Sequence, residues 1–155
     1  MINAFLRITF TFCLFAFVSC TQKYYTPYEY QGAQLIIGTG GGYTGQVIEY
    51  TLLDNGQVFG GTNKEGKVTM TPKLNKKTTK QLFSNYEILD FKQLQVDKPG
   101  NMYHYLIYKN GETNHKLQWG AYDAETPREL LIYFANLKKI LSSAVKSETE
   151  ESSIK

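Results

Sequence analysis

Short apolar segments separated by glycine and polar turn residues follow one another along the first half of the chain, a pattern typical of short strands. β-branched and aromatic residues are enriched in four early segments, which is the composition that a pleated, half-buried surface favours. Asn55-Gly56 follows the second segment, and this dipeptide is a strong hairpin signal because both residues tolerate positive φ in a type I′ turn. The pattern predicts a meander of four strands. The expected strands are residues 34–37, 46–53, 57–61 and 67–71.

A helical period follows this meander. Leu82, Phe83, Tyr86 and Leu89 recur at spacings of three and four residues, which aligns them on one face of a helix. Asn75 precedes them at a position where its side chain can cap the first free amides. The pattern predicts an amphipathic helix that packs on the sheet.

A second hairpin is expected around Asn110-Gly111. Residues 102–109 and 112–119 flank this dipeptide, and one face of the hairpin that they form is expected to be mostly apolar. Centring a two-residue turn on Asn110 and Gly111 fixes the partner of every residue in the two strands. The expected pairs are Lys109 with Glu112, Tyr108 with Thr113, Leu106 with His115, His104 with Leu117 and Met102 with Trp119.

A final helix is predicted from about residue 127 to Ala144. Thr126 and Glu129 have the spacing of a capping box, with Pro127 at the first helical position. Leu130, Phe134, Leu137 and Leu141 then form one apolar stripe. The full order is four strands, a helix, a hairpin and a helix. It predicts an α+β fold, in which an antiparallel meander sheet of about six strands carries two helices on one face.

Length and composition fit one globular domain, which we expect to span residues 33–145. The chain has 155 residues, of which 42% are hydrophobic, and 17 basic against 14 acidic side chains. A dedicated nucleic-acid binder needs a concentrated basic face to displace counterions from phosphates. The near balance of charge therefore argues against a nucleic-acid partner.

The amino terminus has the pattern of an export signal that ends at a lipidated cysteine. Residues 8–18 form an apolar run that is too short to span a bilayer, and Ser19-Cys20 follows it directly. We expect residues 1–19 to be a lipoprotein signal peptide and Cys20 to carry the lipid that attaches the protein to a membrane. An ordinary secretory signal with Cys20 as an incidental thiol is the alternative.

Both ends of the mature chain are expected to lie outside the folded core. Residues 20–32 contain four tyrosines and a proline without sustained periodicity, which suits a tether between lipid and domain. Residues 146–155 are almost entirely polar, so they cannot bury enough apolar surface to offset the entropy lost on ordering. We predict a disordered tail there.

The chain also resembles a set of uncharacterised lipoproteins from Bacteroidota. The resemblance lies in residues 17–20, 40–45, 50–56, 80–83, 99–103 and 119–120. It implies a lipid-anchored protein of the outer membrane but carries no known activity. Lipoproteins of this kind that reach the cell surface usually have acidic residues after the cysteine, whereas Thr21-Gln22-Lys23 follows here. The periplasmic face is therefore expected.

No recognisable catalytic or cofactor motif stands out. The glycine-rich residues 38–45 lack the Gly-Lys-Ser/Thr ending of a phosphate-binding loop, and we expect them to connect two strands. His104 and His115 share one face of the second hairpin, but no third histidine or cysteine in the domain completes a metal site. We expect partly buried, hydrogen-bonded histidines, no metal, no cofactor and no enzymatic activity.

Aromatic residues give the best lead to function. Tyr103 and Tyr105 are predicted to point away from the core, and Tyr43 and Tyr122 fall in loops. Such rings are enriched at protein interfaces, so a noncatalytic protein-binding or inhibitor-like module with an envelope partner is the first hypothesis. The second is a glycan- or peptide-binding lipoprotein that uses the glycine-rich loop with Tyr43 and Trp119. A further possibility is that the tether covers the tyrosine face as a second layer.

Overall fold

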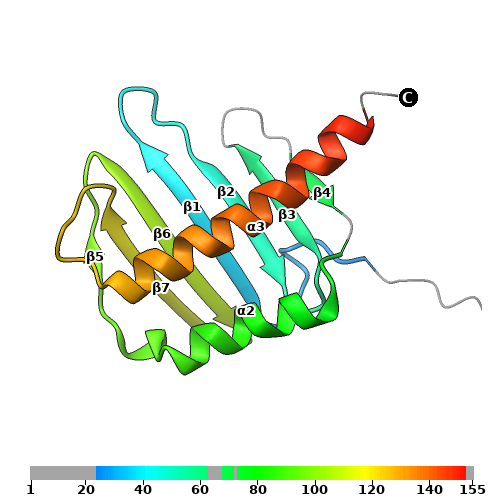
Figure 1. Ribbon diagram of the computed structural model, residues 1–155, viewed down its shortest axis with the longest axis horizontal. Coiled ribbons are helices and arrows are strands. Elements are labelled where there is room, and N and C mark those ends of the chain that lie inside the picture. Colours follow the sequence, from blue (N-terminus) through cyan, green and yellow to red (C-terminus); the bar gives the residue numbers. More distant parts are fainter. Residues whose placement is uncertain (1–23, 63–67, 72, 153–155) are drawn as a thin grey trace, which may run out of the picture.

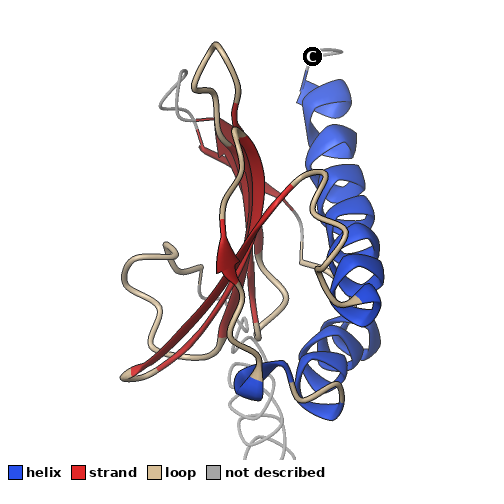
Figure 2. Ribbon diagram, turned by 90° about the vertical axis from the view of Figure 1, so that its left-hand side faces the viewer, coloured by secondary structure: helices blue, strands red, loops and turns tan. Residues whose placement is uncertain are grey.

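The computed structural model describes residues 24–62, 68–71 and 73–152, and within them it has an α+β architecture. One seven-stranded sheet carries two helices on one of its faces (Figures 1 and 2). The predicted fold class and the helix placement are therefore confirmed. The elements are β1 (Gln34–Gly41), β2 (Ile48–Leu53), β3 (Val58–Thr62), β4 (Val68–Thr71), α2 (Lys76–Ile88), η1 (Phe91–Gln93), β5 (Asp97–Lys98), β6 (Met102–Asn110), β7 (Thr113–Gly120) and α3 (Arg128–Ser152).

The sheet has the order β4-β3-β2-β1-β6-β7-β5, with β1 at its centre. All neighbours are antiparallel except β5, which pairs in parallel with β7 through two residues. The six predicted strands are present, and β5 is the addition. Its formation depends on β7, where the Gln118 amide donates to the Val96 carbonyl at 2.8 Å.

The helices begin where the sequence predicts. The Asn75 side chain accepts a hydrogen bond from the Thr78 amide at 2.9 Å and caps α2. α3 crosses the sheet diagonally in Figure 1, and the Tyr133 hydroxyl donates to the Leu82 carbonyl of α2 at 3.0 Å. Leucines of the central strands fill the space beneath the helices. The fully buried leucines of this core are Leu35, Leu52, Leu106, Leu117, Leu130, Leu137 and Leu141.

The prediction of a disordered tail is wrong for residues 146–152, which is the part of the tail that the structure describes. α3 continues past Ala144 to Ser152 instead of ending near the last apolar position. Adding a turn to an existing helix fixes one residue per new hydrogen bond and avoids the cost of nucleation. A polar segment that would not form a helix alone can therefore extend one.

The second hairpin has a different register from the predicted one. Asn110 lies opposite Thr113, so the central turn residues are Gly111 and Glu112. Gly111 has φ 55°, as the first central residue of a type II′ turn requires. The whole pairing is therefore shifted by two residues, and because side chains alternate with period two, each stays on its predicted face.

The first hairpin also turns differently. The Gly56 amide donates to the Leu53 carbonyl at 2.9 Å, and Gly56 has φ 91°. These features describe a three-residue loop that ends in a glycine bulge, instead of a two-residue type I′ turn centred on Asn55 and Gly56. The hairpin itself lies where the sequence predicts it.

The N-terminal segment, residues 24–33, packs against the domain. Tyr25 exchanges two hydrogen bonds with the Gln57 side chain, at 3.2 Å and 3.1 Å. The Gln34 side chain donates to the Pro27 and Tyr30 carbonyls, both at 3.0 Å. Much of the expected tether is thus part of the fold, and in Figure 1 it lies behind the sheet, on the side away from the helices.

Candidate functional site

The five aromatic residues predicted as a binding site lie in three separate places. Tyr43 and Tyr122 lie in loops at one end of the sheet, Tyr103 and Tyr105 lie on the face away from the helices, and Trp119 lies in the core. Cys20, the predicted lipid attachment site, is outside the described residues. The sequence therefore found exposed aromatic positions in the loops but did not find one continuous site.

Three loops meet at the end of the sheet that contains Tyr43 and Tyr122. We call residues 42–47, 99–102 and 120–127 together the loop end. The Gly42 amide donates to the Asn101 carbonyl at 2.8 Å, and the Ala121 amide donates to the Met102 carbonyl at 2.8 Å. These backbone hydrogen bonds hold three segments that are distant in sequence at fixed positions.

Large side chains of the loop end are exposed to solvent. Tyr43 is fully exposed, Tyr122 is 93% exposed and Met102 is 39% exposed. A shallow hollow of about 640 Å³ lies beside Met102 and Tyr122, and the ion pair between Lys98 and Glu125 lines it. Met102 is exposed because it lies at the very start of β6.

Asp123 shapes the loop that contains Tyr122. One of its carboxylate oxygens accepts from the Glu125 amide at 2.9 Å, and the other accepts from the Thr126 hydroxyl at 3.2 Å. An aspartate that bonds its own backbone two residues on forms an Asx turn, which restrains a loop locally. The ring of Tyr122 is therefore presented by a restrained segment.

Tyr105 is on the predicted face of β6, but the expectation that it is exposed is wrong. Its side chain is 8% exposed and lies over Gly38 of β1, where a Cβ atom would be 2.1 Å from the ring. Tyr103 is half-buried and lies over Gly40 in the same way. The glycine-rich segment expected to be a loop is thus partly strand, and its missing side chains give the two rings room.

The Tyr105 hydroxyl donates to the carboxylate of Glu49 on β2 at 2.5 Å. Burial, followed by this hydrogen bond and the charge of Glu49, raises the pKa of Tyr105 well above its usual value. Tyr105 therefore remains a hydrogen-bond donor. Sequence patterns did not single out Glu49, because its partner is 56 positions away and only the strand pairing brings the two together.

Trp119 is fully buried, so its predicted role in ligand binding is wrong. Its ring packs edge-on against Phe134 of α3 at 5.1 Å and against His104 at 5.9 Å. Among the described residues, its Nε1 is the one buried side-chain nitrogen or oxygen without a hydrogen-bond partner. Because α3 covers Trp119, it cannot form a ligand site with the distant Tyr43.

His104 is partly buried and hydrogen-bonded, as predicted. Its Nδ1 is 3.1 Å from the Thr39 hydroxyl, which also accepts from the Lys138 ammonium at 3.2 Å. Burial, and to a lesser extent the positive charge of Lys138, lowers the pKa of His104 below 6.5. The neutral imidazole is therefore favoured in the folded protein.

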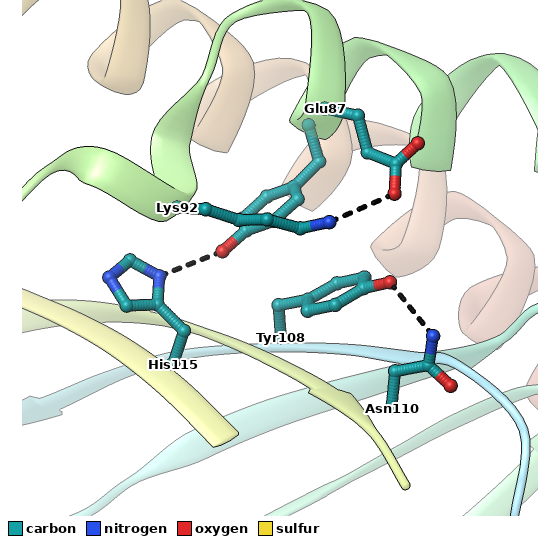
Figure 3. A network of polar contacts seen from close by, with 6 residues as sticks. Glu87, Lys92, Tyr108, Asn110 and His115 are labelled. Carbon is teal, nitrogen blue, oxygen red and sulfur yellow. Dashed lines mark hydrogen bonds and ion pairs between the residues drawn. The ribbon is translucent and has the colours of Figure 1, made fainter. Parts of the chain in front are cut away.

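His115 belongs to a separate polar network between β7 and α2 (Figure 3). Its Nε2 is 3.0 Å from the Leu94 carbonyl, and since a carbonyl only accepts, this nitrogen bears a proton. Its Nδ1 is hydrogen-bonded to the buried Tyr86 hydroxyl at 2.8 Å. Tyr86 stacks on Tyr108 at 4.6 Å, which gives the network a structural role.

The two histidines do not approach one another, because the observed register pairs His104 with Trp119 and His115 with Tyr108. Within the part of the chain that the structure describes, no three His, Cys, Asp or Glu side chains gather closely enough to hold a metal ion. The described helices also include none that is both long and apolar enough to cross a membrane.

No protein-family model and no curated protein matches this chain. The resemblance to Bacteroidota lipoproteins therefore stays a prediction.

Proposed function

We propose that this protein is a lipid-anchored protein of the outer membrane, facing the periplasm, that acts as a noncatalytic protein-binding module. The loop end is the proposed contact surface. One observation carries the proposal: two tyrosines with almost complete exposure, Tyr43 and Tyr122, lie on separate loops that both hydrogen-bond to residues 101–102. They are 79 positions apart in the sequence, so the fold itself brings them to one end.

The chemistry of the loop end suits recognition of a protein surface. Tyrosine rings offer large contact areas and lose little side-chain entropy when they become buried. Met102 adds an adaptable apolar side chain between them, and Met is also enriched at interfaces. The backbone hydrogen bonds among the loops limit the entropy that binding would cost.

The position of the N-terminal segment also supports the loop end as the contact surface. Tyr25 is hydrogen-bonded to Gln57, which adjoins the β2–β3 turn at the end of the sheet opposite the loop end. A lipid on Cys20 would be attached five residues before Tyr25. With the lipid attached there, the loop end would face away from the membrane, toward proteins of the periplasm.

Site-specific photocrosslinking in intact envelopes tests this proposal. A photoreactive phenylalanine analogue is placed at position 43 or 122 of the full chain, with position 88 as the control. Ile88 is 78% exposed but lies on α2, away from the loop end. We expect positions 43 and 122 to give the same adduct and position 88 to lack it.

Alanine variants then measure the energy of the contact. Truncating an interface anchor typically costs about 2 kcal/mol or more of binding free energy. Tyr43→Ala and Tyr122→Ala should each weaken the crosslinked partner's binding about tenfold or more, while Ile88→Ala leaves it unchanged. Adducts that are equally strong from all three positions, or absent from 43 and 122, would refute the proposal.

A glycan- or peptide-binding lipoprotein is the second candidate, and the hollow beside Tyr122 favours it. Its volume of about 640 Å³ lies in the range of small-ligand sites. Of the aromatic pair first expected to hold the ligand, Tyr43 remains accessible and Trp119 does not. Soluble envelope glycans or short peptides that shift the NMR signals of Gly100 and Gly120 would favour this candidate over protein binding.

A further inference from the structure

A groove lies on the sheet face opposite the helices, and it is separate from the loop end. We call it the back groove. Its volume is about 420 Å³, and residues 26–28 of the N-terminal segment form one wall while β2 and β3 form the other. The side chains of Pro27, Tyr28 and Phe59 make much of its lining apolar. Its size is within the range of sites for small ligands and peptide side chains.

One carboxylate lies in this groove in an unusual setting. Glu49 is paired with Gly38 on β1 and with Gly61 on β3, so its neighbours on both adjacent strands lack side chains. The ring of Tyr105 occupies the space above Gly38, and its hydroxyl binds one carboxylate oxygen. On the other side, Glu49 and Gly61 both line the groove. The carboxylate is thus positioned by Tyr105 and accessible from the groove.

Glu49 forms no ion pair within the described residues. The ion pairs found there join Lys92 to Glu87 and Lys98 to Glu125, and neither involves Glu49. The hydrogen bond from Tyr105 leaves lone pairs on the carboxylate, since an ionised carboxylate has about four acceptor sites. Glu49 can therefore accept further hydrogen bonds from a charged donor.

We propose that the back groove binds an arginine or lysine side chain of an extended peptide. Glu49 would accept charge-assisted hydrogen bonds from the cationic head. The aliphatic stem of such a side chain packs well against apolar walls, here Pro27 and Phe59. The exposed ring of Tyr28 lines the same groove and offers a π face to the cation. This proposal does not depend on the loop end or on the function proposed for it.

A titration of the full chain with matched peptides tests the charge requirement. The probes are acetyl-Gly-Arg-Gly-amide and the same peptide with citrulline, which has nearly the shape of arginine but no charge. Binding is followed by isothermal calorimetry and by NMR shifts of Gly60 and Gly61. We expect saturable binding of the arginine peptide and at least tenfold weaker binding of the citrulline peptide. Equal binding of the two, or none up to millimolar peptide, would overturn the proposal.

Variants of the protein test the role of the groove residues. Glu49→Gln keeps the shape of the side chain and should weaken binding of the arginine peptide about tenfold. Glu112→Gln makes the same charge change in the exposed β6–β7 turn and should leave the binding unchanged. Tyr28→Ala should weaken binding several-fold without lowering the melting temperature, because Tyr28 is 96% exposed. Equal affinities for the Glu49→Gln variant and the native protein would exclude Glu49 as the binding group.

Discussion

Gly38 and Tyr105 fit together more closely than any pattern in the sequence indicates. Because a Cβ on Gly38 would lie 2.1 Å from the Tyr105 ring, alanine at this position would displace the ring or the strand. We predict that Gly38→Ala lowers the free energy of unfolding by about 1–3 kcal/mol, the usual cost of overpacking. Urea denaturation measures this change.

A double-mutant cycle identifies the cause of that loss. Tyr105→Ala alone should cost about 3 kcal/mol or more, because the ring is only 8% exposed. In the double variant the clash disappears, so the combined loss should be clearly smaller than the sum of the two single losses. Additive losses, within about 0.5 kcal/mol, would show that the two residues do not interact.

His104 should make the stability of the protein depend on pH. Its folded pKa lies below the unfolded value of about 6.5, so the unfolded chain binds the proton first as the pH falls. The stability that the neutral ring contributes is therefore complete above pH 6.5 and is lost as the pH falls through the folded pKa. We predict a steeper loss of unfolding free energy between about pH 7 and 5 in the native protein than in the His104→Gln variant. Parallel pH profiles for the two proteins would contradict this.

At the scale of elements, the sequence predicted the features that depend on one local segment. It missed the features that depend on pairing between distant segments. α2 was predicted from its Asn75 cap and apolar stripe, which lie within one segment. Both hairpins were predicted at the right place, but their turns differ, because Asn-Gly fits several turn geometries and tertiary pairing selects one. β5 consists of two residues and exists only beside β7. The burial of Tyr105 likewise depends on Gly38, a residue on another strand.

The cap of α2 offers a test of one local signal. Asn75→Ala removes the acceptor for the Thr78 amide and should cost about 1 kcal/mol of unfolding free energy. Asn75→Asp is the matched control, because it keeps the acceptor and adds a negative charge to a first turn that has no acidic residue. Thermal or urea denaturation should rank the aspartate variant at least as stable as the native protein. Equal stability of the alanine variant would mean that the cap contributes nothing.

For the whole molecule, the lipid anchor is the central prediction from the sequence. Cys20→Ser should release the protein from membranes or leave an uncleaved precursor, because a serine cannot receive the thioether-linked lipid. Cys13→Ser is the matched control, since Cys13 lies within the segment expected to be removed. Membrane fractionation with mass spectrometry distinguishes the two variants. A Cys20→Ser protein that stays in membranes at the mature mass would disprove lipidation.

If Cys20 carries the predicted lipid, the docking of residues 24–33 also limits how far the domain can lie from the bilayer. If residues 20–32 were undocked and fully extended, the domain could lie up to roughly 45 Å from the bilayer, at about 3.5 Å per residue. Because Gln57 holds Tyr25, a lipid on Cys20 would be at most five extended residues, or roughly 17 Å, from the docked segment. The eight residues of β1 add about 26 Å to the loop end. A partner would therefore have to present its surface within roughly 45 Å of the bilayer, and for a membrane-bound partner this confinement raises the effective concentration of the two surfaces.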